Sequence, residues 1–153
     1  MVGSGSNPTW SPSDPGEAGS AGGRRLSLGL LPYRLAVCRL GPEEPLPPWA
    51  LSGAFSSLTR TPEELSIVCE ETLVPEGTCA ERGWRALQVK GQFAFSETGI
   101  LASLAGPLSL AGIACFAIST FDTDYILLAD RVVESAIGVL RRAGHEVSRT
   151  PAH

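Results

Sequence analysis

Two apolar runs near the C-terminus are interrupted by a short segment that is dense in carboxylates and hydroxyls. The runs cover residues 113–118 and 125–128, and the intervening residues 119–124 read Ser-Thr-Phe-Asp-Thr-Asp. β-Branched and aromatic runs on either side of a short polar segment predict two strands, buried on both faces and joined as a hairpin. A two-residue turn is enough to close such a hairpin. The additional polar groups therefore indicate a binding or catalytic role at one end of a sheet.

Three carboxylates are candidates for this role, and two of them also have a structural explanation. Asp122 can satisfy backbone donors within the turn, and Glu97 can favour the positive start of a following helix. Asp124 stands directly before the second apolar run and is harder to explain in this way, which makes it the strongest candidate. Because paired carboxylates can support acid–base catalysis, Asp124 and Glu97 are compatible with a small enzyme as well as with a binding site.

The residues around Glu97 and Asp124 are complementary to the two ends of an α-amino acid. Gly99 has no side chain, so backbone amides at a helix start can approach a ligand carboxylate, and Thr98 can add a hydroxyl donor. Glu97 and Asp124 supply negative charge for an amine or a cationic side chain. The sequence therefore predicts that a polar or cationic amino acid binds between residues 97–100 and 119–124.

The segments around the hairpin predict the framework that positions it. Alternation indicates a strand at 84–89, and apolar residues at helical spacing indicate a helix at 99–111 with a kink at Pro107. After the hairpin, Asp130 can cap a helix that Gly144 ends, and residues 145–148 form a last strand. This β-α-β-β-α-β order predicts an α+β, ferredoxin-like fold, in which two helices cover one face of a four-stranded sheet.

The N-terminal half is predicted to be rich in strands and poor in helix. We expect strands at 26–40 (with a turn or bulge at Pro32), 54–59 and 66–69, and short helical turns at 49–53 and 61–64. The first 23 residues are dominated by Gly, Ser and Pro, and such a composition predicts disorder. We therefore divide the chain into a tail at 1–23, a β-rich half at 24–82, a C-terminal domain at 83–149 and a short tail at 150–153.

Three segments, taken together, resemble the ACT-domain family of regulatory amino-acid-binding modules. They are FSETGIL at 95–101, PLSLAGI at 107–113 and ISTFDTDYILL at 118–128. More narrowly, they are similar to the bacterial tandem-ACT proteins related to the cytosolic arginine sensor of the mTOR pathway. The resemblance implies an ACT domain in the C-terminal half, preceded by a truncated ACT-like half, and a non-catalytic ligand sensor. It implies ligand contacts at Phe95, Glu97, Thr98, Gly99, Ile100, Ser119, Thr120, Phe121 and Asp124.

The resemblance also implies how such a site is completed. In the related sensor the ligand lies between two ACT units, so here the second unit would come from another copy of the chain, and we expect a homodimer. Two alternatives of other classes remain. One is a ligand-free dimer with a structural or partner-docking role, and the other is a small enzyme that uses Asp124 and Glu97.

Composition and residue spacing argue against several further functions. A formal net charge of −4 without a clustered basic patch argues against nucleic-acid binding. No run approaches the roughly 18 apolar residues needed to span a membrane. The four cysteines and two histidines lack the spacing of a zinc site, and no motif suggests a cofactor. His145 is expected to be solvated, and Cys38, Cys69 and Cys115 are expected to be reduced and buried, as in a cytoplasmic protein.

Overall fold

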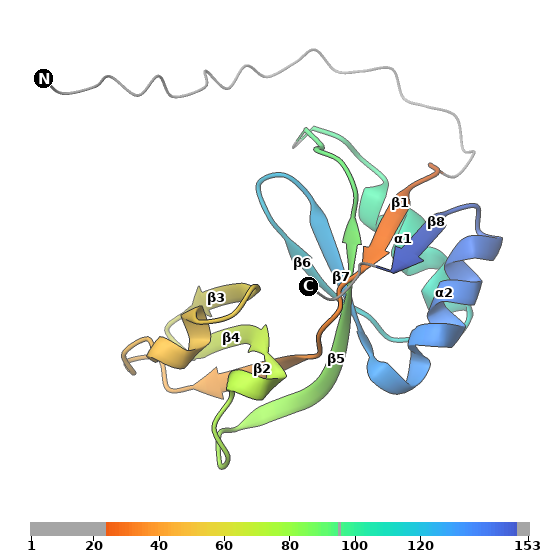
Figure 1. Cartoon of the computed structure of the whole chain (residues 1–153). Helices are drawn as coiled ribbons and strands as arrows, with labels where there is room; N and C mark the ends of the chain where they lie inside the picture. Colours follow the sequence, from red (N-terminus) through yellow and green to blue (C-terminus); the bar gives the residue numbers. More distant parts are fainter. Residues whose placement is uncertain (1–23, 95, 150–153) are drawn as a thin grey trace, which may run out of the picture.

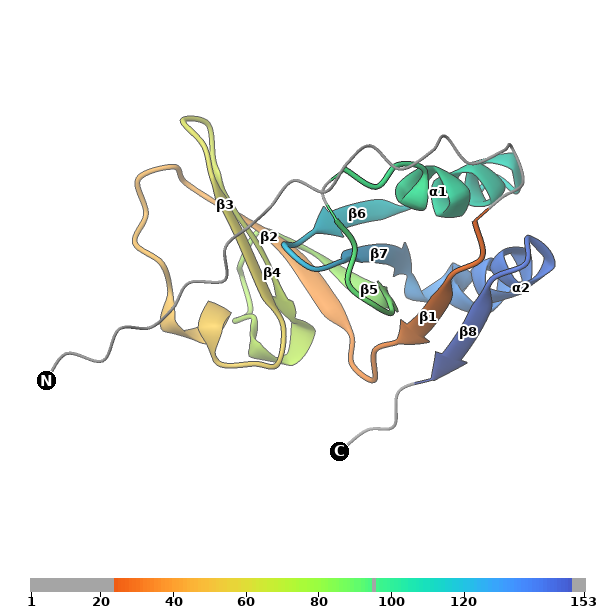
Figure 2. The same ribbon diagram turned by 90° about the horizontal axis from the view of Figure 1, so that it is seen from above.

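The computed structural model describes residues 24–94 and 96–149, which form one eight-stranded sheet with two α-helices on one side (Figures 1 and 2). The strands are β1 (Ser27–Leu30), β2 (Leu35–Leu40), β3 (Ser56–Arg60), β4 (Leu65–Glu70), β5 (Ala80–Val89), β6 (Phe116–Ser119), β7 (Asp124–Ala129) and β8 (Glu146–Arg149). The helices are α1 (Ile100–Leu110) and α2 (Val133–Arg142), and single 3-10 turns are η1 (Pro48–Leu51), η2 (Glu71–Leu73) and η3 (Asp130–Val132). Neither α-helix in this part of the chain is long and apolar enough to cross a membrane. The predicted tails at 1–23 and 150–153 lie outside the described residues.

The C-terminal part of the sheet has the predicted ferredoxin-like order, with one strand added. The elements β5, α1, β6, β7, α2 and β8 follow one another along the chain, and the strands lie in the order β6-β7-β5-β1-β8. The added strand, β1, pairs antiparallel with β5 and parallel with β8. The single strand predicted at 26–40 is therefore two strands. β1 lies before the predicted boundary at residue 82 but packs with the elements that follow it.

The long strand β5 connects the two halves of the sheet. Its first residues pair with β2. In turn β2 pairs with β4, and β4 pairs with the edge strand β3. Its later residues pair with β1 on one edge and with β7 on the other. One strand of ten residues thus belongs to both halves, so the predicted strand at 84–89 is longer than expected.

Alternation along β7 places its side chains in two separate cores. Ile126 and Leu128 pack under α1 and α2, whereas Tyr125 and Leu127 face the N-terminal half. Burial on both faces is therefore confirmed for β7. It is wrong for β6, on which Phe116, Ala117 and Ser119 are exposed and Ile118 is half-buried.

His145 is buried, and the prediction that it is solvated is wrong. It is 5% exposed, its Nδ1 accepts a hydrogen bond from the Leu26 amide at 3.1 Å, and its Nε2 lies 2.9 Å from the Ser103 carbonyl oxygen. In an α-helix the Ser103 carbonyl would accept from residue 107, but that residue is Pro107 and has no N–H. The imidazole Nε2–H therefore supplies the donor that the proline lacks, which accounts for a proline inside α1.

Asp130 does not cap α2 as predicted. No side-chain hydrogen bond caps this helix, which begins at Val133 after the turn η3. The Asp130 carboxylate instead accepts from Arg34 at 2.7 Å and from Arg85 at 3.4 Å, and so joins η3 to the segment before β2 and to β5. The predicted stop at Gly144 agrees with the structure, since this residue has a φ of 98° directly after the helix.

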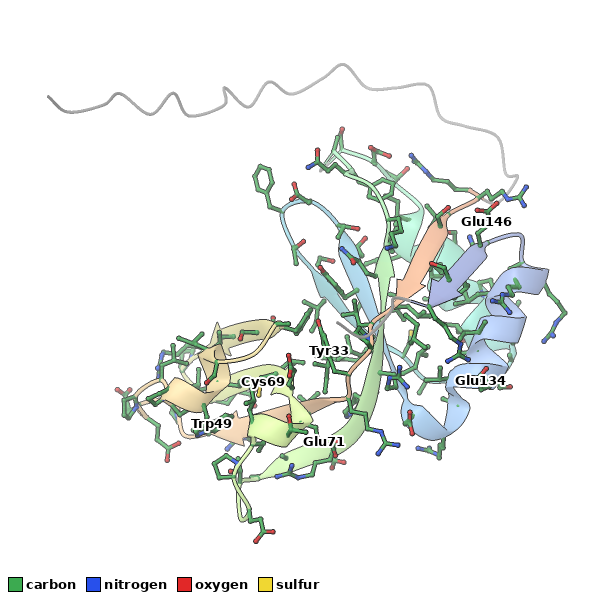
Figure 3. The ribbon with its side chains drawn as sticks, viewed as in Figure 1. Tyr33, Trp49, Cys69, Glu71, Glu134 and Glu146 are labelled. Carbon is green, nitrogen blue, oxygen red and sulfur yellow. The ribbon has the colours of Figure 1, made fainter. Side chains whose placement is uncertain are left out.

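The N-terminal half encloses a small core of its own between its strands and η1. Cys38 and Cys69 lie in this core, and Trp49 packs against it (Figure 3). Cys115, expected to be buried, is only partly buried, and Cys79 is exposed. Residues 61–64 form the tight turn between β3 and β4 rather than a helical turn. Thr61 nevertheless uses its hydroxyl in the way a capping residue does, accepting from the amides of Glu63 and Glu64 at 3.2 Å each.

Candidate functional site

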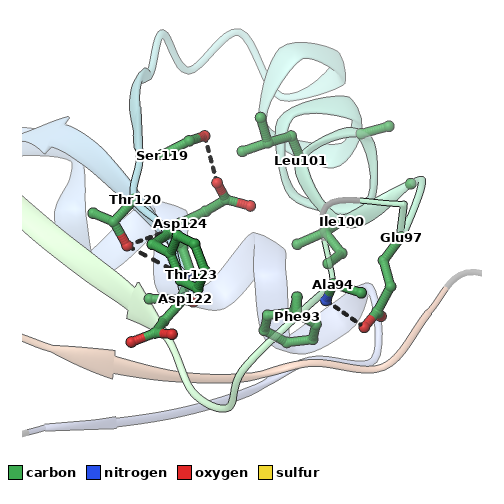
Figure 4. Close-up of a pocket in the computed structure, with 13 residues that line it drawn as sticks. Phe93, Ala94, Glu97, Ile100, Leu101, Ser119, Thr120, Asp122, Thr123 and Asp124 are labelled. Atoms are coloured by element: carbon green, nitrogen blue, oxygen red, sulfur yellow. Dashed lines mark hydrogen bonds between the residues drawn. The ribbon is translucent and has the colours of Figure 1, made fainter. Parts of the chain in front are cut away.

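A cavity of about 320 Å³ opens where the β6–β7 hairpin meets the start of α1 (Figure 4). Its walls are the loop after β5, the first turn of α1 and the hairpin residues 119–124. The residues that line it are Phe93, Ala94, Glu97, Gly99, Ile100, Leu101, Ala102, Ser119, Thr120, Phe121, Asp122, Thr123 and Asp124. The separate segments 93–102 and 119–124 therefore meet at this cavity.

The hairpin that forms one wall is held by its own threonines. The Thr120 hydroxyl donates to the Thr123 carbonyl at 3.0 Å and accepts from the Thr123 amide at 3.2 Å, and a backbone bond joins the same two residues at 2.8 Å. Thr123 is 8% exposed, and its hydroxyl donates to the Val89 carbonyl at 2.6 Å. The Thr120 hydroxyl thus closes the hairpin and the Thr123 hydroxyl fixes it on β5, so the shape of this wall does not depend on a ligand.

The loop after β5 is held by Glu97 and by a backbone contact to the hairpin. The Phe93 amide donates to the Asp122 carbonyl at 3.0 Å. The Glu97 carboxylate accepts from the Ala94 amide at 3.0 Å, and the Glu97 amide donates to the Ala94 carbonyl at 2.9 Å. The same carboxylate forms an ion pair with Arg24, whose guanidinium carbon lies 5.6 Å from the centre of the Phe93 ring. Figure 4 shows this carboxylate turned toward the Ala94 amide, away from Asp124.

Gly99 opens the start of α1 to the cavity. Its φ of 82° lies in the left-handed region, which glycine adopts without strain. A side chain built at this position would meet no atom within 4 Å, so the space beside it is empty. The first amides of a helix have no partner within the helix and carry the positive end of its dipole. At this wall the cavity therefore offers hydrogen-bond donors suited to a carboxylate.

Asp124 provides the opposite charge on the facing wall. It lies at the start of β7, and the Ser119 hydroxyl across the hairpin donates to its Oδ1. The described lining contains three carboxylates, those of Glu97, Asp122 and Asp124, and no lysine, arginine or histidine. Burial, together with the charge of Asp122, raises the pKa of the neighbouring Tyr125. The cavity thus presents amide donors on one side and negative charge on the other.

The structure brings together most of the residues that the sequence singled out. Glu97, Gly99, Ile100, Ser119, Thr120, Phe121 and Asp124 all line the cavity. Thr98 is exposed and is not part of the lining, and Phe95 lies outside the described residues. Contact of any of these residues with a ligand stays a prediction.

Sequence reasoning did not identify four apolar or small residues of the lining, namely Phe93, Ala94, Leu101 and Ala102. Leu101 and Ala102 follow Gly99 in the first turn of α1, so the helix prediction could have placed them beside the site. Phe93 and Ala94 lie after the last residue of β5 in a segment without periodicity, and no signal in the sequence indicated their position.

A second hollow, of about 550 Å³, lies near the beginning of β5 and the end of β7. Its charged residues include Asp130, which is engaged by two arginines, and Arg82, whose guanidinium donates to three backbone carbonyls. These groups hold the fold together. Among the described residues, no cluster of histidine, cysteine, aspartate and glutamate is placed to hold a metal ion.

Two family models match this chain. The model described as an ACT domain matches residues 80–142, which include the whole cavity. A second model, described as an N-terminal domain, matches residues 34–77. The two matched ranges fall in the two halves of the sheet and leave out β1 and β8.

Three similar proteins illustrate the match. The X-ray crystal structure of a protein from Agobacterium tumefaciens is 39% identical, with a TM-score of 0.80, over 85% of this chain and 97% of that chain. The human protein named cytosolic arginine sensor for mTORC1 subunit 1 is 43% identical over 60 residues, which are 39% of this chain and 18% of the sensor. The chain thus matches only about a fifth of the length of this curated relative. The regulatory subunit of aspartate kinase from Thermus thermophilus shares the fold, with a TM-score of 0.52 and 10% identity over 72% of this chain and 93% of that chain.

Proposed function

Because this chain belongs to the ACT-domain family, we propose that it is a non-catalytic regulatory module that binds a small amino acid in the cavity between α1 and the β6–β7 hairpin. The observation that carries the proposal is the pairing of two unlike walls. The start of α1 offers amide donors beside Gly99, and Asp124 offers a carboxylate across the cavity. An α-amino acid carries a carboxylate and an ammonium group, so it can satisfy both walls at once.

The family relationship supports the same class of ligand. The human relative is named for sensing arginine, and the match to it is confined to a fifth of its length. We extend to this chain only the class of ligand, an amino acid that is polar or cationic. The acidic lining favours a cationic one, since no basic side chain of the described lining competes for the carboxylates. By the same relationship we infer a cytoplasmic location.

Glu97 and Asp124, the two carboxylates most strongly indicated by the sequence, have different hydrogen-bond partners, and this favours binding over acid–base catalysis. Glu97 is held by the Ala94 amide and by Arg24, whereas Asp124 is held by the Ser119 hydroxyl. Catalysis by a carboxylate pair requires both groups to reach the reacting atoms of one bound substrate. Here Glu97 stabilises the loop, and Asp124 is the carboxylate that we expect to contact the ligand.

We further infer that the ligand is enclosed at an interface between two copies of the chain. The helix α1 contains no charged residue, and Leu101 and Leu110 on it are 37% and 93% exposed. A helix that is apolar on all sides is normally buried, so we expect another protein surface to cover the exposed side of α1. Ala102, which is exposed and lies eight residues before Leu110 on the same side of the helix, also lines the cavity. A second copy packed on this side of α1 would therefore cover the ligand as well.

The binding proposal is tested by a thermal-shift screen of the twenty amino acids with the full chain. At a hundredfold excess over its dissociation constant, a ligand stabilises the folded state by about 2.7 kcal/mol, which corresponds to a rise in Tm of roughly 5–15 °C for a domain of this size. Asp124→Asn keeps an oxygen that accepts the Ser119 hydroxyl and removes the charge, so it should abolish most of the shift. Glu76→Gln, an equal change of charge on an exposed loop, should leave the shift unchanged. A shift that survives Asp124→Asn would place the site elsewhere.

Sedimentation velocity tests the interface separately. We expect a dimer at micromolar concentration, and Leu110→Arg should convert it to a monomer by placing a charge on the apolar side of α1. Leu51→Arg provides the matched control, because Leu51 is also exposed but lies on η1 in the N-terminal half. A monomeric wild-type protein would refute the interface and leave the ligand screen unaffected.

A further inference from the structure

Arg24 contacts two residues of the cavity lining although it lies outside the cavity. Its guanidinium pairs with the Glu97 carboxylate and lies over the face of Phe93. A carboxylate together with an aromatic face is a common environment for a cationic group in proteins. The cation that occupies this environment belongs to the protein itself, on the segment directly before β1.

The consequence for the cavity is electrostatic. The three carboxylates of the described lining would give it a formal charge of −3, and the Arg24 guanidinium offsets one of them. No basic side chain of the described residues forms an ion pair with Asp122 or Asp124, so the negative charge is concentrated on the hairpin wall. Arg24 therefore shifts the attraction for a cation from the α1 side of the cavity toward Asp124.

We propose that Arg24 is a specificity-determining residue of the amino-acid site, which limits the preference for cationic over neutral ligands by acting as a built-in counter-cation on Glu97 and Phe93. This inference rests on the proposed function. Arg24 touches no ligand itself and acts through Glu97. Its side chain is 46% exposed, and exposed ion pairs contribute little to stability. Its effect should therefore appear in ligand preference rather than in folding.

Isothermal titration calorimetry with two pairs of ligands of similar shape tests the proposal. Arginine is compared with citrulline, and lysine with norleucine, since the members of each pair differ mainly in the charge of the side chain. In Arg24→Gln, the ratio of affinities for the cationic and the neutral member should rise by about threefold to tenfold, the size expected for one partly exposed charge whose interaction with the ligand is screened by water and salt. Arg24→Lys keeps the charge and should stay close to wild type.

Arg25→Gln provides the matched control. Arg25 is the adjacent residue, it is exposed, and it pairs with Glu146 on β8 at 3.7 Å rather than with the cavity loop. This variant should leave both affinity ratios unchanged, and all three variants should melt within about 4 °C of wild type.

The outcomes separate this inference from the proposed function. An equal loss of affinity for both members of a pair in Arg24→Gln would mean that Arg24 only braces the loop, and this would overturn the inference. An unchanged ratio would overturn it too, while binding itself would still support the proposed function. Absence of binding of any of the twenty amino acids to the wild-type protein would overturn the proposed function, and this inference with it.

Discussion

The hydrogen bond between His145 and Ser103 leads to a quantitative prediction about Pro107. His145→Ala removes the acceptor of the Leu26 amide and the donor to the Ser103 carbonyl, both in a part of the protein where the side chain is 5% exposed. A buried polar group left without a partner costs about 1–3 kcal/mol. Because the two lost bonds are accompanied by a cavity, we expect His145→Ala to lower the free energy of unfolding by about 2–4 kcal/mol.

Part of this loss should depend on the proline. Pro107→Ala supplies a backbone N–H at the position that normally bonds to the Ser103 carbonyl, so in this background the carbonyl keeps a partner when His145 is removed. His145→Ala should then cost about 1 kcal/mol less, which is the net contribution of one hydrogen bond. The contribution of the Leu26 bond should be the same in both backgrounds, since Leu26 lies on the other side of the imidazole.

A double-mutant cycle measures this coupling. Urea unfolding of the wild type, both single variants and the double variant, followed by far-UV circular dichroism, gives the coupling free energy directly. Pro62→Ala, in the turn between β3 and β4, replaces Pro107→Ala in a control cycle and should be additive with His145→Ala. If the Pro107 cycle is also additive to within about 0.3 kcal/mol, His145 does not replace the missing donor and our explanation of the helix is wrong.

Two further predictions concern single positions. Gly99→Ala should destabilise the fold by about 1–2 kcal/mol, because an L-residue at a φ of 82° is strained even where there is space; Gly106→Ala, inside α1 with equal space, should instead stabilise it by about 0.5–1 kcal/mol. Equal effects of the two changes on urea unfolding would contradict the role given to the backbone at Gly99. Burial, and then the neighbouring Cys38 thiol, raises the pKa of Cys69 from 9.0 to about 11. The folded state thus holds this proton to higher pH than the unfolded state does, so the associated stability is present below pH 9 and is lost as the pH rises toward 11. Cys69→Ala should flatten this alkaline decline and the exposed Cys79→Ala should not, and a decline of the same slope in all three proteins would show that Cys69 is not its source.

The sequence alone was sufficient for the local features. The spacing of apolar residues predicted α1, α2, β7 and the hairpin at 119–124, because helix and strand periodicity depend on neighbours only a few residues away. Gly99 and Gly144 were correctly placed at helix ends for the same reason, and both have positive φ values. Asp124 was singled out because a carboxylate beside a buried strand is unusual, and it lies in the cavity.

Only the tertiary structure decided which distant residues meet. β1 and β8 pair although they are more than a hundred residues apart, and periodicity carries no information about that partner. The same limit explains why two further expectations were wrong. His145 was expected to be solvated and Asp130 to cap a helix, but both bond to residues far away in sequence. It also explains why the contact between Arg24 and Glu97, which are 73 positions apart, was not predicted. The sequence therefore determined the elements and the polar residues at their ends, whereas long-range packing determined the walls, the charge and the shape of the cavity.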